Sequence, residues 1–125
     1  MRLREKQENP WLKSRIVIKI TSKKFGDKYY KQKAEVLEVI YKFKALVKLI
    51  QDGSKITVDQ NEIETVIPAV GRQVLILQGR FRGKTAILES LEMDKFSANL
   101  KLCDSKEKIV SLPYEQFSTT TSAVC

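Results

Sequence analysis

The segment from residue 78 to residue 84 carries the strongest chemical signal in the sequence. It reads Gln-Gly-Arg-Phe-Arg-Gly-Lys, so three cations, Arg80, Arg82 and Lys84, stand at alternate positions around Phe81. Arginine and lysine side chains hydrogen-bond to phosphate oxygens, and an aromatic ring offers a face on which a base can stack. Glycine on both sides lets the backbone turn sharply and approach a ligand. This pattern indicates phosphate binding, and its alternative is a β-hairpin with ordinary surface charges.

A second segment combines lysines with tyrosines. Lys28 and Lys31 flank Tyr29 and Tyr30, and Lys33 follows two residues later. Such interleaving suits a protein that follows a nucleic-acid backbone with its cations and stacks bases on its rings. The alternative is structural: one tyrosine packs in the core, the other lies flat, and Lys33 is an ordinary edge lysine. The candidate nucleic-acid-binding residues are therefore Lys28, Tyr30, Lys31, Lys33, Arg80, Phe81, Arg82 and Lys84.

Residues that catalysis needs are missing from the sequence. It contains no histidine, which excludes His-based acid–base catalysis, serine–histidine nucleophile pairs and zinc sites that need imidazole. Two cysteines, Cys103 and Cys125, are too few for a thiolate zinc site or a disulfide framework. Glu62 and Glu115 each fall in a short helical turn, where free backbone amides favour an acid for structural reasons. We therefore expect no enzymatic activity, no metal and no cofactor.

The balance of charge points to a polyanionic partner. The 125 residues include 23 Lys and Arg against 15 Asp and Glu, for a net charge of +8. The cations concentrate in residues 13–33, which contain one acid, Asp27, and in residues 71–84, which contain none. Nucleic acids attract such segments, whereas a charge kept only for solubility would be spread more evenly.

No segment of the sequence suggests a membrane or a secretory route. The longest strongly apolar run is residues 74–77, far shorter than a membrane-spanning helix. The first residues lack the apolar core of a secretory signal. We expect a soluble, intracellular monomer with reduced cysteines and no membrane partner.

Short strands must position the two cationic segments. Apolar and polar residues alternate or apolar residues run together in residues 16–20, 34–41, 43–49, 56–58, 65–67, 73–77, 86–88, 96–102 and 109–110. Asp52-Gly53 is typical of a hairpin turn, and residues 59–62 and 113–116 each read as one helical turn. The pattern stops at Pro68 and restarts after Gly71, so residues 68–71 are a short joint.

The second half of the chain repeats the first. Adding 53 to positions 42–62 gives eight identities, at Lys42, Phe43, Ala45, Lys48, Leu49, Lys55, Ile56 and Glu62. We therefore expect an all-β fold made of two small five-stranded barrels that pack on each other, with Trp11 or Leu12 covering part of the seam. The expected organisation is a flexible lead (1–10), a first barrel (11–67), a linker (68–71), a second barrel (72–117) and a flexible tail (118–125).

Two resemblances sharpen this interpretation. Residues 71–88 resemble a KOW motif, in which a Gly/Lys loop joins two strands, although Ala86 stands where the motif usually has a third glycine. Residues 11–117 resemble the C-terminal tandem of SH3-like barrels in the Kin-type nuclear DNA/RNA-binding proteins, related to a RecA antigen. The segments that carry this resemblance are Trp11-Leu12, residues 17–20, residues 23–26, residues 31–34, residues 38–40, residues 64–69, Arg82-Gly83, residues 88–90, residues 96–98 and Tyr114-Glu115.

The resemblance implies a function and a site. It implies a nuclear protein that binds RNA or DNA, has nuclear protein partners, and is linked to DNA replication, DNA damage and mRNA processing. It also implies an anion-binding groove between the barrels that uses two lysines. Lys33 matches the first of these lysines, whereas Thr119 stands near the position of the second.

Two functions follow from these observations. The first is a non-enzymatic nucleic-acid-binding module in which the cationic loops meet on one side of the molecule and grip phosphates. The second is a protein-interaction module of the SH3 or Tudor type, which would need a groove or cage of aromatic residues. Tyr29, Tyr30, Tyr41 and Phe43 could supply part of such a groove.

Overall fold

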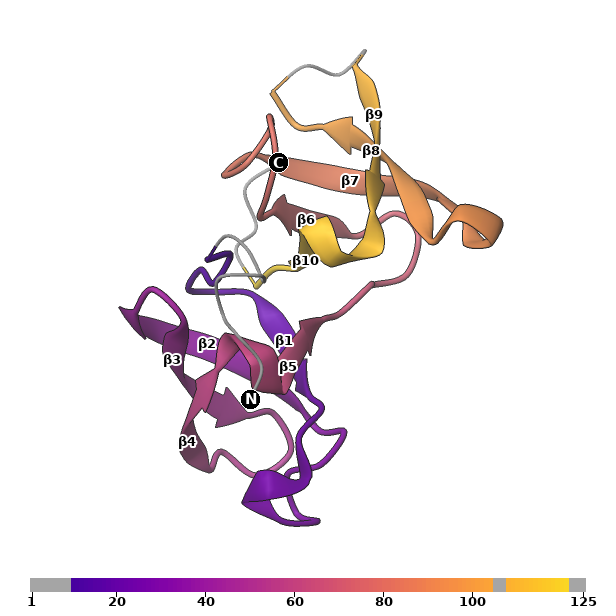
Figure 1. Cartoon of the computed structure of the whole chain (residues 1–125). Coiled ribbons are helices and arrows are strands. Elements are labelled where there is room, and N and C mark those ends of the chain that lie inside the picture. The colour runs from indigo at the N-terminus through magenta and orange to yellow at the C-terminus, as the bar shows by residue number, and fades with distance from the viewer. Residues whose placement is uncertain (1–9, 105–107, 122–125) are drawn as a thin grey trace.

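Two five-stranded antiparallel sheets form the protein, as Figure 1 shows. The structure is a computed structural model that describes residues 10–104 and 108–121. The first sheet contains β1 (Val17–Ile20), β2 (Lys33–Tyr41), β3 (Lys44–Leu49), β4 (Lys55–Asp59) and β5 (Ile63–Thr65). The second contains β6 (Gln73–Ile76), β7 (Thr85–Glu92), β8 (Ser97–Leu102), β9 (Ile109–Pro113) and β10 (Phe117–Thr119). The predicted all-β fold is confirmed.

The two sheets have the same topology. Their strand orders are β4-β3-β2-β1-β5 and β10-β6-β7-β8-β9, so each strand of the first sheet has a counterpart five strands later. Short 3-10 helices occupy matching positions: η3 (Gln60–Glu62) precedes β5, and η5 (Tyr114–Gln116) precedes β10. The other two in the described part of the chain are η2 (Lys23–Phe25) and η4 (Met93–Lys95). The topology therefore agrees with a duplicated unit.

The constant offset of 53 residues holds only through the third strand of each unit. β3 and β8 match at that offset, since their bounds are Lys44–Leu49 and Ser97–Leu102. The loop that follows is one residue longer in the second unit, so η3 and η5 match at an offset of 54. Glu115 therefore corresponds to Asn61, and the expected equivalence of Glu62 and Glu115 is wrong. Glu62 accepts a hydrogen bond from the Asp59 amide in a capping box that the second unit lacks.

Strand β6 is a wall shared by two cores. Val74 and Ile76 point into the core of the second unit, whereas Leu75 and Leu77 pack against the core of the first. This explains why residues 74–77 are continuously apolar, because a strand buried on both faces has no polar side. The two units therefore pack on each other, as expected. Leu12 is buried in the first core and Trp11 is half-buried against it.

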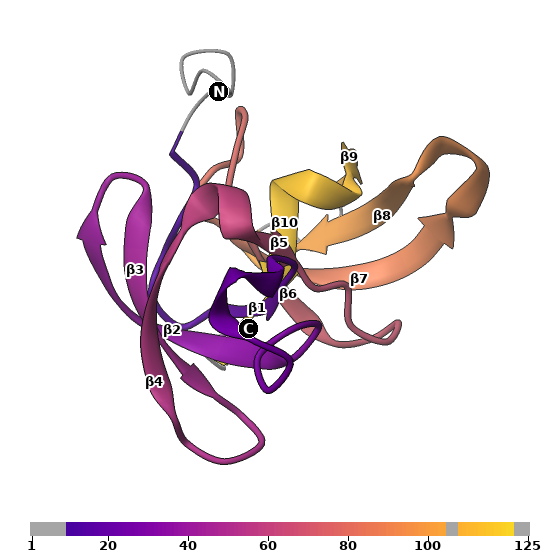
Figure 2. The ribbon, with the colours of Figure 1, turned by 60° about the horizontal axis from the view of Figure 1, so that its bottom comes forward.

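Strand β10 joins the units and corrects the expected tail. Ser118 is fully buried, and its hydroxyl accepts a hydrogen bond from the Val66 amide at 2.8 Å and donates to the Val17 carbonyl at 2.7 Å. Thr120 forms a β-bridge with Ile16 across the seam. Residues 118–121 are thus part of the packed structure, because their hydroxyls satisfy backbone groups of the first unit. In Figure 2, β1, β5, β6 and β10 lie centrally between the outer strands of both sheets.

Three further expectations meet the structure. Strand β5 ends at Thr65 instead of extending to residue 67, because the amide and carbonyl of Val66 bond to β10. Cys103 is disulfide-bonded, so the expectation of reduced cysteines is wrong for this residue. The expected flexible lead and the end of the tail fall largely on residues 1–9 and 122–125, which lie outside the described residues, as does Cys125. In the part of the chain that is described, no helix could span a membrane.

Candidate nucleic-acid interface

The first cationic segment forms the β1–β2 loop (residues 21–32), which its own hydrogen bonds hold in shape. Ser22 caps η2 by accepting from the Lys24 amide, and Gly26 ends η2 with a φ of 98°. The amide of Lys31 donates to the Ile20 carbonyl at 2.7 Å, and the Ile20 amide donates to the Gln32 carbonyl at 2.9 Å, which closes the base of the loop. The loop is therefore a defined platform for its side chains.

The two tyrosines of this loop have different surroundings. Tyr29 packs against the first core and meets Phe25 edge-on, with ring centroids 6.4 Å apart. Tyr30 lies between two lysines, with the Lys23 and Lys31 ammonium nitrogens 5.2 and 5.5 Å from its ring centroid. The structure thus brings Tyr30 and Lys31 together, as a combined cation and aromatic surface requires.

Other cations of the first unit are paired with carboxylates. The Lys28 ammonium lies 3.3 Å from Asp52, whose pKa is held below its usual value by hydrogen bonds from Ser54 and then by Lys28. The Lys24 ammonium lies 2.8 Å from Glu62, and the hydrogen bond and charge of Glu62 raise the pKa of Lys24. Lys28 is therefore less available to a phosphate than the sequence suggests.

Lys33 begins β2 and is exposed on the outer face of the first sheet. It stands directly across from Lys19 in the β1–β2 pairing, and the Lys19 ammonium lies 3.6 Å from Glu64. Thr119, at the other position implied by the family groove, is half-buried, and its hydroxyl donates to the Val66 carbonyl at 3.0 Å. Its role is to tie β10 to the first unit, and it offers no second cation to Lys33.

The second cationic segment forms the β6–β7 loop (residues 77–84). Gly79 and Gly83 adopt φ values of 87° and 89°, which side chains rarely allow. The Gly83 amide donates to the Ile76 carbonyl at 2.8 Å, and the Leu77 amide donates to the Gln116 carbonyl at 2.7 Å. The loop is therefore anchored both to its own strand and to the segment before β10.

Phe81 anchors this loop and carries two cations. Its half-buried ring packs against the second core, with the Arg80 guanidinium carbon 5.5 Å and the Lys108 ammonium 5.3 Å from its centroid. Arg80 and Arg82 are exposed, and neither has an ion pair with a carboxylate among the described residues. Phe81 thus orients the cations beside it, and its own face is partly covered.

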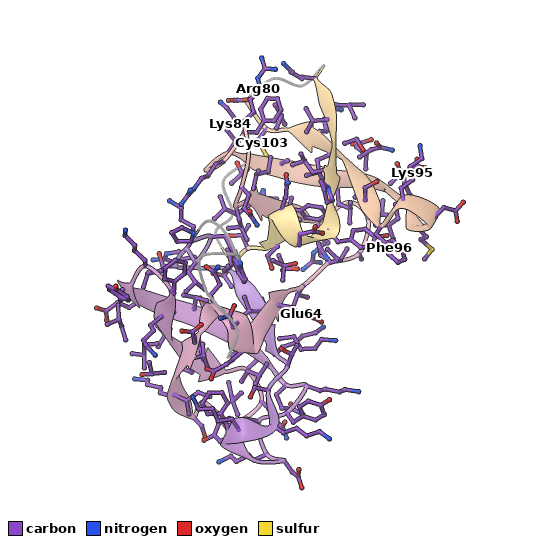
Figure 3. The ribbon with its side chains drawn as sticks, viewed as in Figure 1. Glu64, Arg80, Lys84, Lys95, Phe96 and Cys103 are labelled. Carbon is purple, nitrogen blue, oxygen red and sulfur yellow. The ribbon has the colours of Figure 1, made fainter. Side chains whose placement is uncertain are left out.

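Lys84 is held by a carboxylate. Its ammonium lies 2.6 Å from Asp104, and the hydrogen bond from Lys84 lowers the pKa of Asp104. The short separation and the pKa shift agree that this cation is engaged within the protein. Figure 3 shows Lys84 near Arg80 at the end of the second unit that is remote from the first.

The two loops do not meet, so the expectation that they grip a ligand from one side is wrong. In Figure 1 the β1–β2 loop lies at the bottom of the molecule, and the β6–β7 loop lies near the top. The seam explains this arrangement. It joins the start of β1, at Ile16 and Val17, to Ser118 and Thr120, whereas each loop follows the far end of its own strand. The loops therefore point away from each other.

The sequence interpretation missed two cations that complete these surfaces. Lys23 covers one side of Tyr30, and it lay in the basic segment already identified. Lys108 reaches Phe81 from the β8–β9 connection, 27 residues away in the chain. Only the pairing of β6, β7, β8 and β9 places it there, and no local pattern indicates that contact. Among the described residues no group of side chains could hold a metal ion.

Comparison with protein-family models decides what this pair of sheets is. The KN17 SH3-like domain matches residues 7–59, and the KIN17 C-terminal SH3 domain matches residues 68–120. The chain belongs to the KIN17 family. It corresponds to the C-terminal region of KIN17-type proteins, and its two sheets are SH3-like domains.

Curated relatives agree with this assignment. The chain is similar to the Homo sapiens DNA/RNA-binding protein KIN17, with 49% identity over 90 residues, 72% of this chain and 23% of the relative. It is also similar to the Dictyostelium discoideum KIN17-like protein, with 42% identity over 113 residues, 90% of this chain and 25% of the relative. The chain therefore spans about a quarter of the length of these KIN17 relatives.

Proposed function

We propose that this chain is a non-enzymatic module that binds RNA or DNA, chiefly through the phosphate backbone, at two separate sites. One site is the Lys23–Tyr30–Lys31 surface of the β1–β2 loop, with Lys33 beside it. The other is the Arg80–Phe81–Arg82 surface of the β6–β7 loop. Lys28 and Lys84 contribute less, because each already has a carboxylate partner.

The observation that carries the proposal is that both loops hold exposed cations against an aromatic ring without a described carboxylate partner. Such cations keep their charge for a ligand, and each phosphate that they neutralise releases counterions from the nucleic acid. The net charge of +8 adds long-range attraction.

The name of the human relative, a DNA/RNA-binding protein, supports the same proposal. By resemblance to this family, we further propose that the parent protein works in the nucleus and contributes to DNA replication, the response to DNA damage and mRNA processing. The KOW character of residues 71–88 belongs to the same proposal.

Fluorescence anisotropy titrations with single-stranded RNA, double-stranded RNA and double-stranded DNA, each at two salt concentrations, test the function. We expect Arg80→Ala/Arg82→Ala to weaken binding about tenfold and to reduce the slope of log affinity against log salt by about 1.5 to 2. Lys23→Ala/Lys31→Ala should act in the same direction at the other site.

The matched control is Lys42→Ala/Lys95→Ala, which removes the same charge from two corresponding turns outside both loops. Its affinity should fall much less than that of either loop variant. Equal losses in all three variants would reduce the effect to net charge, and an affinity that does not depend on salt would exclude phosphate binding.

Protein interaction through the four aromatics noted in the sequence receives less support. Tyr29 and Tyr30 lie in the loop before β2, whereas Tyr41 and Phe43 lie at the other end of this nine-residue strand. They therefore do not form one groove or cage.

A further inference from the structure

A groove with a volume of about 740 Å³ lies between the two units, away from both cationic loops. Its lining comes from the η3–β5 segment of the first unit and from η5 and the turn before β8 in the second. Figure 3 shows Glu64 and Phe96 on the edges of the two units that face each other. A groove of this size can enclose a side chain together with some of the backbone that bears it.

Aromatic side chains from both units line this groove. Trp11 comes from the segment before β1, Phe96 from the turn before β8, and Tyr114 from η5. Phe96 is 70% exposed and adopts a left-handed conformation with a φ of 51°. A large apolar residue that is both exposed and in this conformation stabilises nothing around it, and such positions concentrate where ligands bind.

The charge of the groove is opposite to that of the rest of the protein. Glu64 and Glu115 line it, and none of its described lining residues is a lysine or an arginine. Glu115 is exposed, and its carboxylate has no hydrogen bond or ion pair with the described residues. Glu64 is also exposed and has a contact of 3.6 Å with Lys19 at the surface. A protein with a net charge of +8 thus keeps one aromatic site that carries only carboxylates.

We propose that this groove binds an arginine-containing, extended segment of a partner protein. A guanidinium stacks on aromatic faces and hydrogen-bonds to a carboxylate with two parallel N–H groups. Trp11, Phe96 and Tyr114 provide the faces, and Glu64 and Glu115 provide the acceptors on opposite units. A nucleic acid is disfavoured here, because its phosphates would approach two carboxylates with no cation between them.

Intrinsic fluorescence reports directly on this site, because Trp11 is the single tryptophan of the chain. The probe is a synthetic glycine- and leucine-based peptide of about nine residues with two arginines. A matched peptide carries citrulline, which keeps the shape of the side chain and lacks its charge. We expect the arginine peptide to change the Trp11 emission with saturation, and the citrulline peptide to bind at least about tenfold more weakly.

Two variants locate the site independently of folding. Glu115→Gln removes an exposed carboxylate, and Phe96→Gly removes the ring while suiting the left-handed backbone. Each should weaken arginine-peptide binding about fivefold to tenfold, and Glu89→Gln, an exposed acid outside the groove, should leave it unchanged. Heteronuclear NMR spectra of each variant verify that both units are folded.

The outcomes separate this proposal from nucleic-acid binding. Equal affinity for the arginine and citrulline peptides, unchanged binding by both groove variants, or no Trp11 response at millimolar peptide would each overturn it. RNA titrations of Glu115→Gln and Phe96→Gly should match the unmodified protein. Loss of RNA affinity in these variants would instead assign the groove to nucleic acid.

Discussion

At the residue scale, the partner of a cation decides whether that cation is available to a phosphate. Lys84 and Arg82 are two residues apart in the same loop, yet only Lys84 has a described carboxylate within salt-bridge distance. The sequence could identify both as basic loop residues. It could not identify Asp104 as the partner of Lys84, because that contact depends on how β7 and β8 pair.

Removing this carboxylate should strengthen nucleic-acid binding. We expect Asp104→Asn to increase RNA affinity about twofold to fivefold and to increase the salt slope by about 0.7 to 0.9, since one more lysine reaches a phosphate. Anisotropy titrations measure both quantities. In a Lys84→Ala background the same substitution should have a much smaller effect, and an equal gain there would show that only net charge matters.

The same pair sets a pH dependence that NMR can follow. The hydrogen bond from Lys84 lowers the pKa of Asp104, so the contribution of this pair to stability is present above the ordinary aspartate pKa and is lost as the pH falls through the lowered value. Lys84→Ala should move the pKa of Asp104 upward in a carboxyl-carbon titration. An unchanged pKa would mean that the two side chains are apart in solution.

At the element scale, β10 shows what alternation alone cannot predict. Residues 118–121 read as a polar Ser/Thr tail, and the strand they begin is only three residues long. By contrast, β2, β3 and β8 announce themselves by regular alternation, and the repeat of 53 residues locates their counterparts. A strand that is held by hydroxyl groups bonding to another unit leaves no such periodic signal.

Ser118→Ala should therefore destabilise the whole chain. The substitution leaves the Val66 amide and the Val17 carbonyl without their partner inside the seam, at a cost of about 1–3 kcal/mol in the free energy of unfolding. Urea denaturation measures this change. Thr57→Ala, at an exposed position of β4, is the control and should cost far less; equal losses would argue against the importance of the buried hydroxyl.

At the scale of the whole molecule, β6 links the stability of the two units. Leu77 follows a strand of the second unit but is fully buried in the core of the first. We expect Leu77→Ala to cost about 2–5 kcal/mol and to lower the melting temperature of both units together. NMR signals from each core during thermal unfolding measure this, and two separate transitions would contradict a shared wall.

The arrangement of the loops was beyond prediction for a related reason. The sequence correctly indicated two small β units in contact, but the directions of their loops depend on which strand ends meet at the seam. Ile16 and Thr120 bring together strand ends that are remote from both loops. A pairing between residues more than a hundred positions apart has no counterpart in local sequence patterns.

Because one strand is built into both cores, the distance between the two cationic loops is fixed, and the protein can act as a molecular ruler. A short oligonucleotide can occupy one end only, whereas a longer one can bridge both and gain affinity from the tethered second contact. Affinity for single-stranded RNA should therefore rise abruptly at a threshold length. A smooth increase with every added nucleotide, or the same threshold after Lys23→Ala/Lys31→Ala, would show that the two ends act independently.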